Sequence, residues 1–140
     1  RFFAYSSNYK SGLKGYGGNV ASYIDKFVEN QNIECAKTPQ KIVDYENRFL
    51  KMIGYADKML GERGFRKAVG SKSTPRARFE ALSIGIILAI EERPNLPVRD
   101  PSSWIESDEF AICTRSDAAN NKTKLLGRIN YVKNKLLEDE

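Results

Sequence analysis

The segment 73-STPRARFEALSIGIILAIEERP-94 predicts a helix that is apolar around most of its circumference. Thr74 can cap the start of this helix, Pro75 suits its first turn, and the proline that closes the segment blocks its continuation. A helix that is apolar on nearly all sides is usually buried at the centre of a domain. Its charge-free part spans only residues 81–90, which is too short to cross a membrane. We therefore expect a buried central helix over about residues 75–92.

Two residues of this helix do not fit an apolar surface, and each predicts a contact. Gly85 lowers helix propensity by about 1 kcal/mol relative to alanine, and we interpret it as a sign that a neighbouring helix approaches closely. Glu80 lies one residue from the apolar face of the helix. We expect its carboxylate to pair with a basic residue across the core, and we favour this structural role over that of a catalytic acid.

The rest of the chain predicts an all-α fold, an irregular bundle of six or seven helices around the central one. Apolar residues recur at spacings of three and four in the longer segments, and no segment shows the alternation typical of a strand. The predicted helices cover residues 1–9, 19–30, 38–60, 75–92, 104–105, 110–114 and 122–137. The polar segment 31–37 is expected to be a connection, and 62–72 a basic loop. These helices and the absence of a sheet are typical of a bundle.

Length and charge set further bounds on the protein. The 140 residues suit one domain, with 41% apolar and 29% charged residues, which is ordinary for a globular protein. The net charge is +5, which favours an anionic partner only weakly, because many basic domains bind nothing anionic. The sequence shows no signal peptide, membrane span or lipidation motif.

The residue content removes most catalytic chemistries. The chain has no histidine, which removes the usual general base near neutral pH, the common nucleophile pairs and histidine metal sites. The glycine-rich stretch 12–18 lacks the Gly-Lys-Ser/Thr ending of a phosphate-binding P-loop. Cys35 and Cys113 stand alone and are expected to be free thiols. We expect no catalytic residue, no metal site and no cofactor.

Two basic clusters remain as candidate binding residues. Between residues 61 and 78 six basic residues oppose a single acid, Glu62, and the cluster ends at a helix start, where free N–H groups favour anions. The second cluster consists of Arg115, Lys122, Lys124, Arg128, Lys133 and Lys135. The candidate nucleic-acid or phosphate contacts are Arg63, Arg66, Lys67, Lys72, Arg76, Arg78, Lys122, Lys124 and Arg128. Each cluster has an alternative interpretation as a solvated face, and the two form one surface only if they lie side by side.

Four stretches in this order resemble one known family. RFFAY (1–5), GFRK (64–67), RARFEALSIGIILAI (76–90) and TRSDAANNKTKLLGRINYV (114–132) resemble the C-terminal helical part of the family known as domain of unknown function 262. That family includes the NTPase half of type IV, modification-dependent restriction systems and related phage-defence proteins. Its members carry an N-terminal ParB-like NTPase domain with an Asp-Gly-Gln-Gln-Arg motif, which this sequence lacks. Arg78 and Glu80 match a recurrent Arg-Phe-Glu feature to which the resemblance assigns no role.

The resemblance implies that residues 1–140 are a single helical domain, a fragment of a longer chain without its N-terminal ParB-like NTPase domain. It implies a bacterial, cytoplasmic protein close to DNA and away from membranes. The expected function is that of an accessory module of a DNA-restriction or phage-defence protein. This module contacts nucleic acid or a neighbouring NTPase domain, which lies in the same protein or in a partner chain. It is not catalytic alone.

Two alternatives are kept beside this function. The first is a purely structural or protein-interaction domain with no nucleic-acid binding, which an exposed apolar patch around Phe2, Phe3 and Tyr5 would favour, because isolated domains seldom expose one. The second is an enzyme in its own right, for example a nuclease. The missing histidine and the missing carboxylate cluster make the second alternative the weakest of the three.

Overall fold

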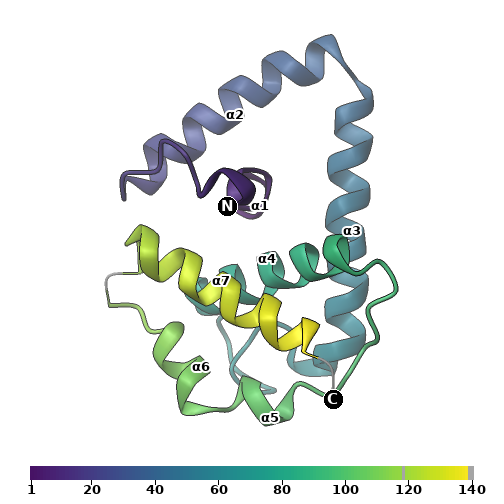
Figure 1. Ribbon diagram of the computed structural model, residues 1–140, viewed down its shortest axis with the longest axis vertical. Helices are drawn as coiled ribbons and strands as arrows, with labels where there is room; N and C mark the ends of the chain where they lie inside the picture. Colours follow the sequence, from purple (N-terminus) through teal and green to yellow (C-terminus); the bar gives the residue numbers. More distant parts are fainter. Residues whose placement is uncertain (118, 139–140) are drawn as a thin grey trace.

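The protein is all-α in a computed structural model that describes residues 1–117 and 119–138 (Figure 1). Within these residues the chain forms seven α-helices, two short 3-10 turns at Tyr9–Ser11 and Gly61–Arg63, and no strand. The helices are α1 (Phe2–Asn8), α2 (Val20–Lys37), α3 (Gln40–Leu60), α4 (Arg76–Glu92), α5 (Ser102–Ile105), α6 (Asp108–Cys113) and α7 (Lys122–Leu137). The predicted fold class is confirmed.

Helix α4 is the buried centre of the fold, as its sequence predicts. All its residues from Ala77 to Ile90 are buried except Phe79, which is half-buried. Helix α7 makes the most extensive contact with α4 and crosses in front of it in Figure 1, while α3 and α1 pack on other sides. The apolar circumference of α4 is therefore covered by helices from both halves of the chain.

Gly85 lies where α4 and α7 approach most closely. A Cβ atom built on Gly85 would lie 2.6 Å from both Cβ and Cγ1 of Val132 and 3.1 Å from the backbone nitrogen of Lys133. A real side chain cannot occupy that space unless α7 moves. The interpretation of this glycine as a close-approach site is confirmed.

Helix α2 and the first half of α3 form an arch above the rest of the bundle, whereas the second half of α3 is buried beside α4 (Figure 1). The side chain of Asn19 caps α2 by accepting a hydrogen bond from Ser22 N at 3.1 Å. The prediction that 31–37 is a connection is wrong, because α2 continues to Lys37. Nothing in 31–37 breaks a helix, and the first proline comes only at position 39.

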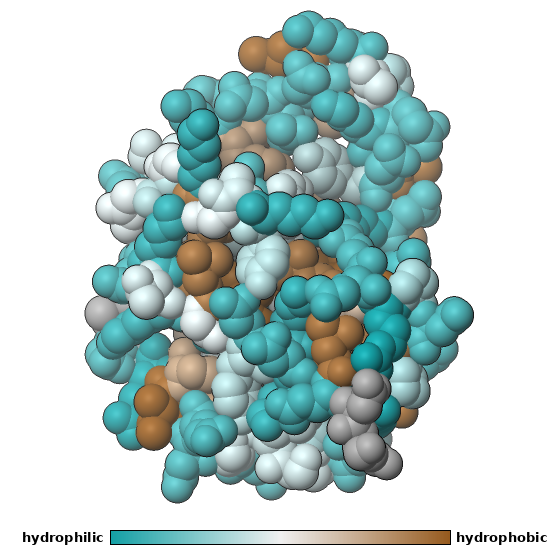
Figure 2. All heavy atoms as spheres, viewed as in Figure 1, coloured by the Kyte–Doolittle hydropathy of each residue, from teal (hydrophilic) through white to brown (hydrophobic). Residues whose placement is uncertain are grey.

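The outer surface of the arch carries exposed apolar side chains. They are Val28, Ile33, Ile42, Val43 and Leu50, and in Figure 2 a brown, hydrophobic group lies at the top of the arch on a mostly hydrophilic face. The N-terminal aromatic residues, by contrast, pack inward: Phe2 and Tyr5 are buried and Phe3 is half-buried. The exposed patch that would favour a protein-interaction domain is therefore not at the N-terminus.

Two further expectations concern single features. Cys35 and Cys113 are both free thiols. Across the described parts of the chain, no helix combines the length and the hydropathy that crossing a membrane requires.

Candidate phosphate-binding surface

The first predicted basic cluster and Arg115 of the second cluster meet where α4 begins. The segment between α6 and α7 lies against Pro75, and together they form two adjoining hollows that share Pro75, Thr114 and Ser116. The first, which we call the α4 hollow, has a volume of about 630 Å³ and is lined also by Thr74, Arg76, Ala77, Ala119, Asn120 and Asn121. The second, which we call the Arg78 pocket, has a volume of about 570 Å³, and its basic lining residues are Lys67, Arg78 and Arg115.

The start of α4 leaves three backbone N–H groups without a helical acceptor. The first helical hydrogen bond runs from Phe79 N to Pro75 O at 3.0 Å, so the N–H groups of residues 76–78 point out of the helix. The expectation that Thr74 caps α4 is wrong. The N-cap is Pro75, no side chain accepts a bond there, and the first turn holds no acidic residue. The positive end of a 17-residue helix is therefore open to an anion.

Arg78 lies inside the fold, in the first turn of α4. The residue is 6% exposed, and its guanidinium carbon lies 5.1 Å from the centroid of the Phe110 ring. Its Nε and Nη2 atoms are buried and donate to no described residue. Burial lowers the pKa of the guanidinium, and the nearby charge of Arg63 lowers it further, although arginine keeps its charge in proteins. A buried cation with unused donors is unfavourable unless an acceptor joins it.

The acidic residues of the Arg78 pocket already have basic partners. Glu106 accepts a hydrogen bond from Arg63 at 2.8 Å, and Asp117 accepts one from Lys124 at 3.1 Å. These pairs neutralise both carboxylates. Lys67, Arg78 and Arg115 therefore leave the pocket with an excess of positive charge.

Two of the predicted contact residues donate to acceptors within the fold. The Arg66 guanidinium donates to the carbonyl oxygen of Arg63 at 3.0 Å and also to those of Glu62 and Ser71, so it holds the basic loop in shape. Arg128 is buried and pairs with Glu80, as described next. Of the other candidates, Lys67, Lys72, Arg76 and Lys124 are exposed, Arg63 and Lys122 are half-buried, and Arg78 lies in its pocket. Their role in binding stays a prediction.

Glu80 forms the core ion pair that its position predicts. Its carboxylate is 1% exposed and pairs with Arg128 at 2.6 Å and also with Arg1. Arg128 donates in addition to the carbonyl oxygen of Ala119 at 2.6 Å. This buried network therefore fixes the segment that forms one wall of the α4 hollow.

Two contributors to this region were not predicted from the sequence. The Tyr16 hydroxyl donates to the carbonyl oxygen of Asn120 at 2.8 Å, and the Asn121 side chain caps α7 by accepting from Lys124 N at 3.2 Å. Asn before a helical repeat is a recognisable cap signal, whereas nothing in the sequence connects Tyr16 with a residue 104 positions away.

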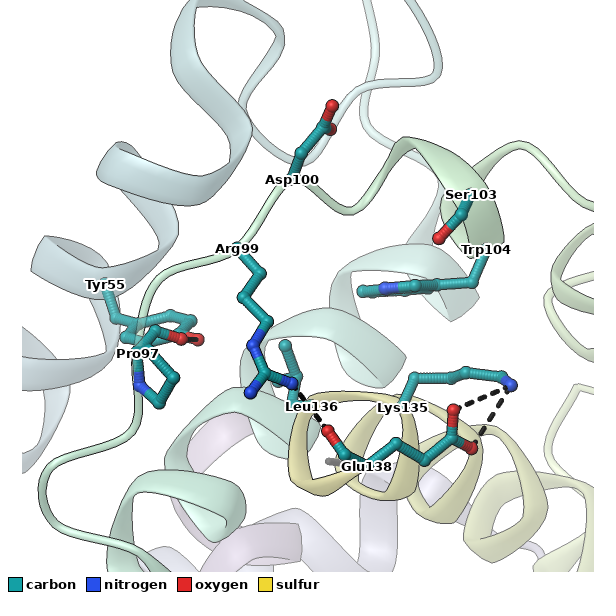
Figure 3. Close-up of a pocket in the computed structure, with 9 residues that line it drawn as sticks. All are labelled: Tyr55, Pro97, Arg99, Asp100, Ser103, Trp104, Lys135, Leu136 and Glu138. Atoms are coloured by element: carbon teal, nitrogen blue, oxygen red, sulfur yellow. Dashed lines mark hydrogen bonds and ion pairs between the residues drawn. The ribbon is translucent and has the colours of Figure 1, made fainter. Parts of the chain in front are cut away.

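A third hollow is less suited to hold a ligand. It has a volume of about 520 Å³ beside the end of α7, and Figure 3 shows that Arg99 and Lys135 turn toward Glu138. Arg99 donates to the carbonyl oxygen of Glu138 at 2.6 Å, and Lys135 donates to the Glu138 carboxylate at 3.1 Å. These contacts hold the last turn of α7 and leave few donors for a ligand. Within residues 1–117 and 119–138, no three acidic or cysteine side chains gather as metal ligands would.

Comparison with family models, with curated proteins and with solved structures finds no match for this chain.

Proposed function

We propose that this domain is a helical accessory module of a DNA-restriction or phage-defence protein, of the kind that its resemblance implies. In this proposal it contacts the phosphates of nucleic acid through one basic surface and performs no catalysis alone. The basic surface comprises Lys67, Lys72, Arg76, Arg78, Arg115, Lys122 and Lys124. The observation that supports it best is that Lys67, Arg76, Arg78 and Arg115 line two adjoining hollows at the open start of α4.

The groups on this surface suit phosphate contacts better than base recognition. Lysine and arginine side chains and backbone N–H groups at helix starts are the usual donors to the nucleic-acid backbone. Such contacts release counterions, so they weaken steeply with salt and carry no sequence information. We therefore expect binding to duplex DNA that is independent of sequence and strongly dependent on salt.

Replacing Lys67, Lys72 and Arg76 together with alanine should weaken the binding of duplex DNA. All three side chains are exposed, and none is a hydrogen-bond donor to another described residue, so the fold should tolerate their loss. Each lost phosphate contact lowers the slope of log affinity against log salt by about 0.9. Fluorescence anisotropy with a labelled duplex at several salt concentrations measures both affinity and slope.

The matched control replaces Lys26, Lys51 and Lys58, exposed residues of α2 and α3, with alanine. It changes the net charge equally but leaves the basic surface intact. An equal loss in both variants would mean that net charge alone drives binding. Unchanged affinity and slope in the first variant would remove DNA from the proposal.

The exposed apolar side chains of the arch favour a second function, that of an interaction module. Val28, Ile33, Ile42, Val43 and Leu50 face solvent, and the neighbouring NTPase domain that the resemblance implies would cover them. The reading frame upstream of Arg1 tests this family context directly. An Asp-Gly-Gln-Gln-Arg motif encoded there would support both the context and the expected neighbour, and an unrelated domain would argue against them.

A further inference from the structure

We propose that the start of α4 and the Arg78 pocket form a specific binding site for a single phosphate group. The inference deepens the proposed function, since it names one site within the basic surface, but it stands on its own observations. Two kinds of donor belong to the first turn of α4, which borders both adjoining hollows. They are the unbonded N–H groups of residues 76–78 and the unused side-chain donors of Arg78.

Arg78 carries the inference because its side chain is buried and incompletely satisfied. At 6% exposure its Nε and Nη2 atoms are buried and donate to no described acceptor, although the residue lines the pocket. The contact with the Phe110 ring orients the guanidinium plane but accepts none of its in-plane N–H bonds. Nε and one Nη of an arginine present two parallel donors, the geometry that matches two oxygens of a phosphate.

The surroundings of Arg78 favour an anion over a neutral ligand. The two carboxylates of the pocket are neutralised by Arg63 and Lys124, whereas Lys67 and Arg115 line it with exposed positive charge. The α4 dipole adds to this potential at the same point. A phosphate there would accept from the helix start and from Arg78, and the exposed basic residues would contact the atoms attached to it.

The phosphate has two possible sources, the internal diester of a nucleic-acid strand and a terminal monoester. Both present at least two non-bridging oxygens to Arg78, so the structure assigns the shared chemistry, and the experiment separates the sources. A duplex with a 5′-phosphate and the same duplex without it provide the two arms.

Arg78→Met is the decisive variant, because the site predicts effects of opposite sign on stability and on binding. Methionine fills much of the same space without charge, so the ligand-free protein should be as stable as the wild type or more stable. In the wild type, replacing chloride by inorganic phosphate at equal ionic strength should raise Tm by about 3–5 °C once the site is nearly saturated. In Arg78→Met this rise should vanish. Lys51→Met, a replacement in α3 beside the C-terminal end of α4, should keep it.

The backbone amides of residues 76–78 provide a second measurement, which does not depend on how any variant folds. Titration of the wild type with inorganic phosphate should shift these amide resonances more than any others. Arg78→Lys keeps the charge but loses the paired donors, and we expect at least a tenfold weaker phosphate affinity. Unshifted amides in the wild type, or wild-type phosphate affinity in Arg78→Met or Arg78→Lys, would overturn the site.

The outcomes with DNA separate this site from the proposed function. Inorganic phosphate binding without duplex binding would keep the site and reject the DNA contact. If the affinity for duplex changes neither with added inorganic phosphate nor in Arg78→Met, the site is rejected and the DNA contact is kept. If the site holds, tighter binding of the 5′-phosphorylated duplex identifies a terminal monoester, and equal binding of both duplexes identifies the internal diester.

Discussion

Glu80→Gln is expected to lower the free energy of unfolding by about 3–5 kcal/mol, because it leaves a buried arginine without a counter-ion. Glu80 is 1% exposed, and the Arg128 side chain that it pairs with is 2% exposed. Glutamine has nearly the same shape, so the loss reports the missing charge and not a cavity. Urea unfolding followed by circular dichroism measures the difference.

The control for Glu80 lies on the same helix. Glu92 pairs with Lys133 at the same distance of 2.6 Å, but its side chain is 56% exposed. Solvent-exposed ion pairs contribute about 0–1 kcal/mol, so Glu92→Gln should cost little. Equal losses in Glu80→Gln and Glu92→Gln would contradict the structural importance that we assign to the buried pair.

The double replacement of Glu80→Leu and Arg128→Met tests whether the unpaired buried charge causes the loss of stability in Glu80→Gln. Removing both charges leaves no unpaired ion between α4 and α7, so we expect the double variant to lose less stability than Glu80→Gln. Arg1 is 23% exposed and can turn its charge toward water. A double variant that is less stable than Glu80→Gln would show that packing and hydrogen bonds to Arg128, and not charge balance, dominate.

Gly85→Ala is expected to destabilise the protein by about 1–2 kcal/mol, because the overpacking cost exceeds the gain in helix propensity. The added methyl group would lie 2.6 Å from two atoms of Val132, and overpacking of this kind costs about 1–3 kcal/mol. The backbone nitrogen of Lys133 at 3.1 Å limits how α7 can give way. The cost should therefore exceed the gain of about 1 kcal/mol in helix propensity.

Gly127→Ala is the matched control for this prediction. Gly127 lies within α7, is exposed, and has no atom within 4 Å of an added Cβ. Here only helix propensity changes, so we expect a gain of up to about 1 kcal/mol. Thermal unfolding of both variants should give shifts of opposite sign. A Gly85→Ala protein as stable as the wild type would contradict the close approach of α4 and α7.

The sequence predicts the core well because the signals for α4 are local. Its apolar circumference, the proline at each end and the unfavourable Gly85 all lie within residues 73–94. The end of α2 was predicted less well. Residues 31–37 show no apolar stripe, and in the structure they stay helical on the exposed arch, where Glu34 pairs with Lys41 at 3.0 Å. An exposed helix has little need of the apolar periodicity by which helices are recognised.

The candidate surface was predicted in composition but not in arrangement. Clustered charge is visible in the sequence, whereas the direction of each side chain depends on tertiary packing. Arg66 and Arg128 turn to internal acceptors, and Arg78 is buried without one. These three arginines look alike in the sequence, and only the structure separates two supporting residues from one candidate ligand contact.

The most direct test of the basic surface is an amide chemical-shift map of the protein titrated with duplex DNA. We predict the largest shifts in two segments, residues 67–78 and the residues around the start of α7 up to 124, and small shifts along α3. Shifts concentrated on the arch, or no shifts at DNA concentrations above those of non-specific binding, about 10⁻⁴ M, would contradict the placement of nucleic acid at the start of α4.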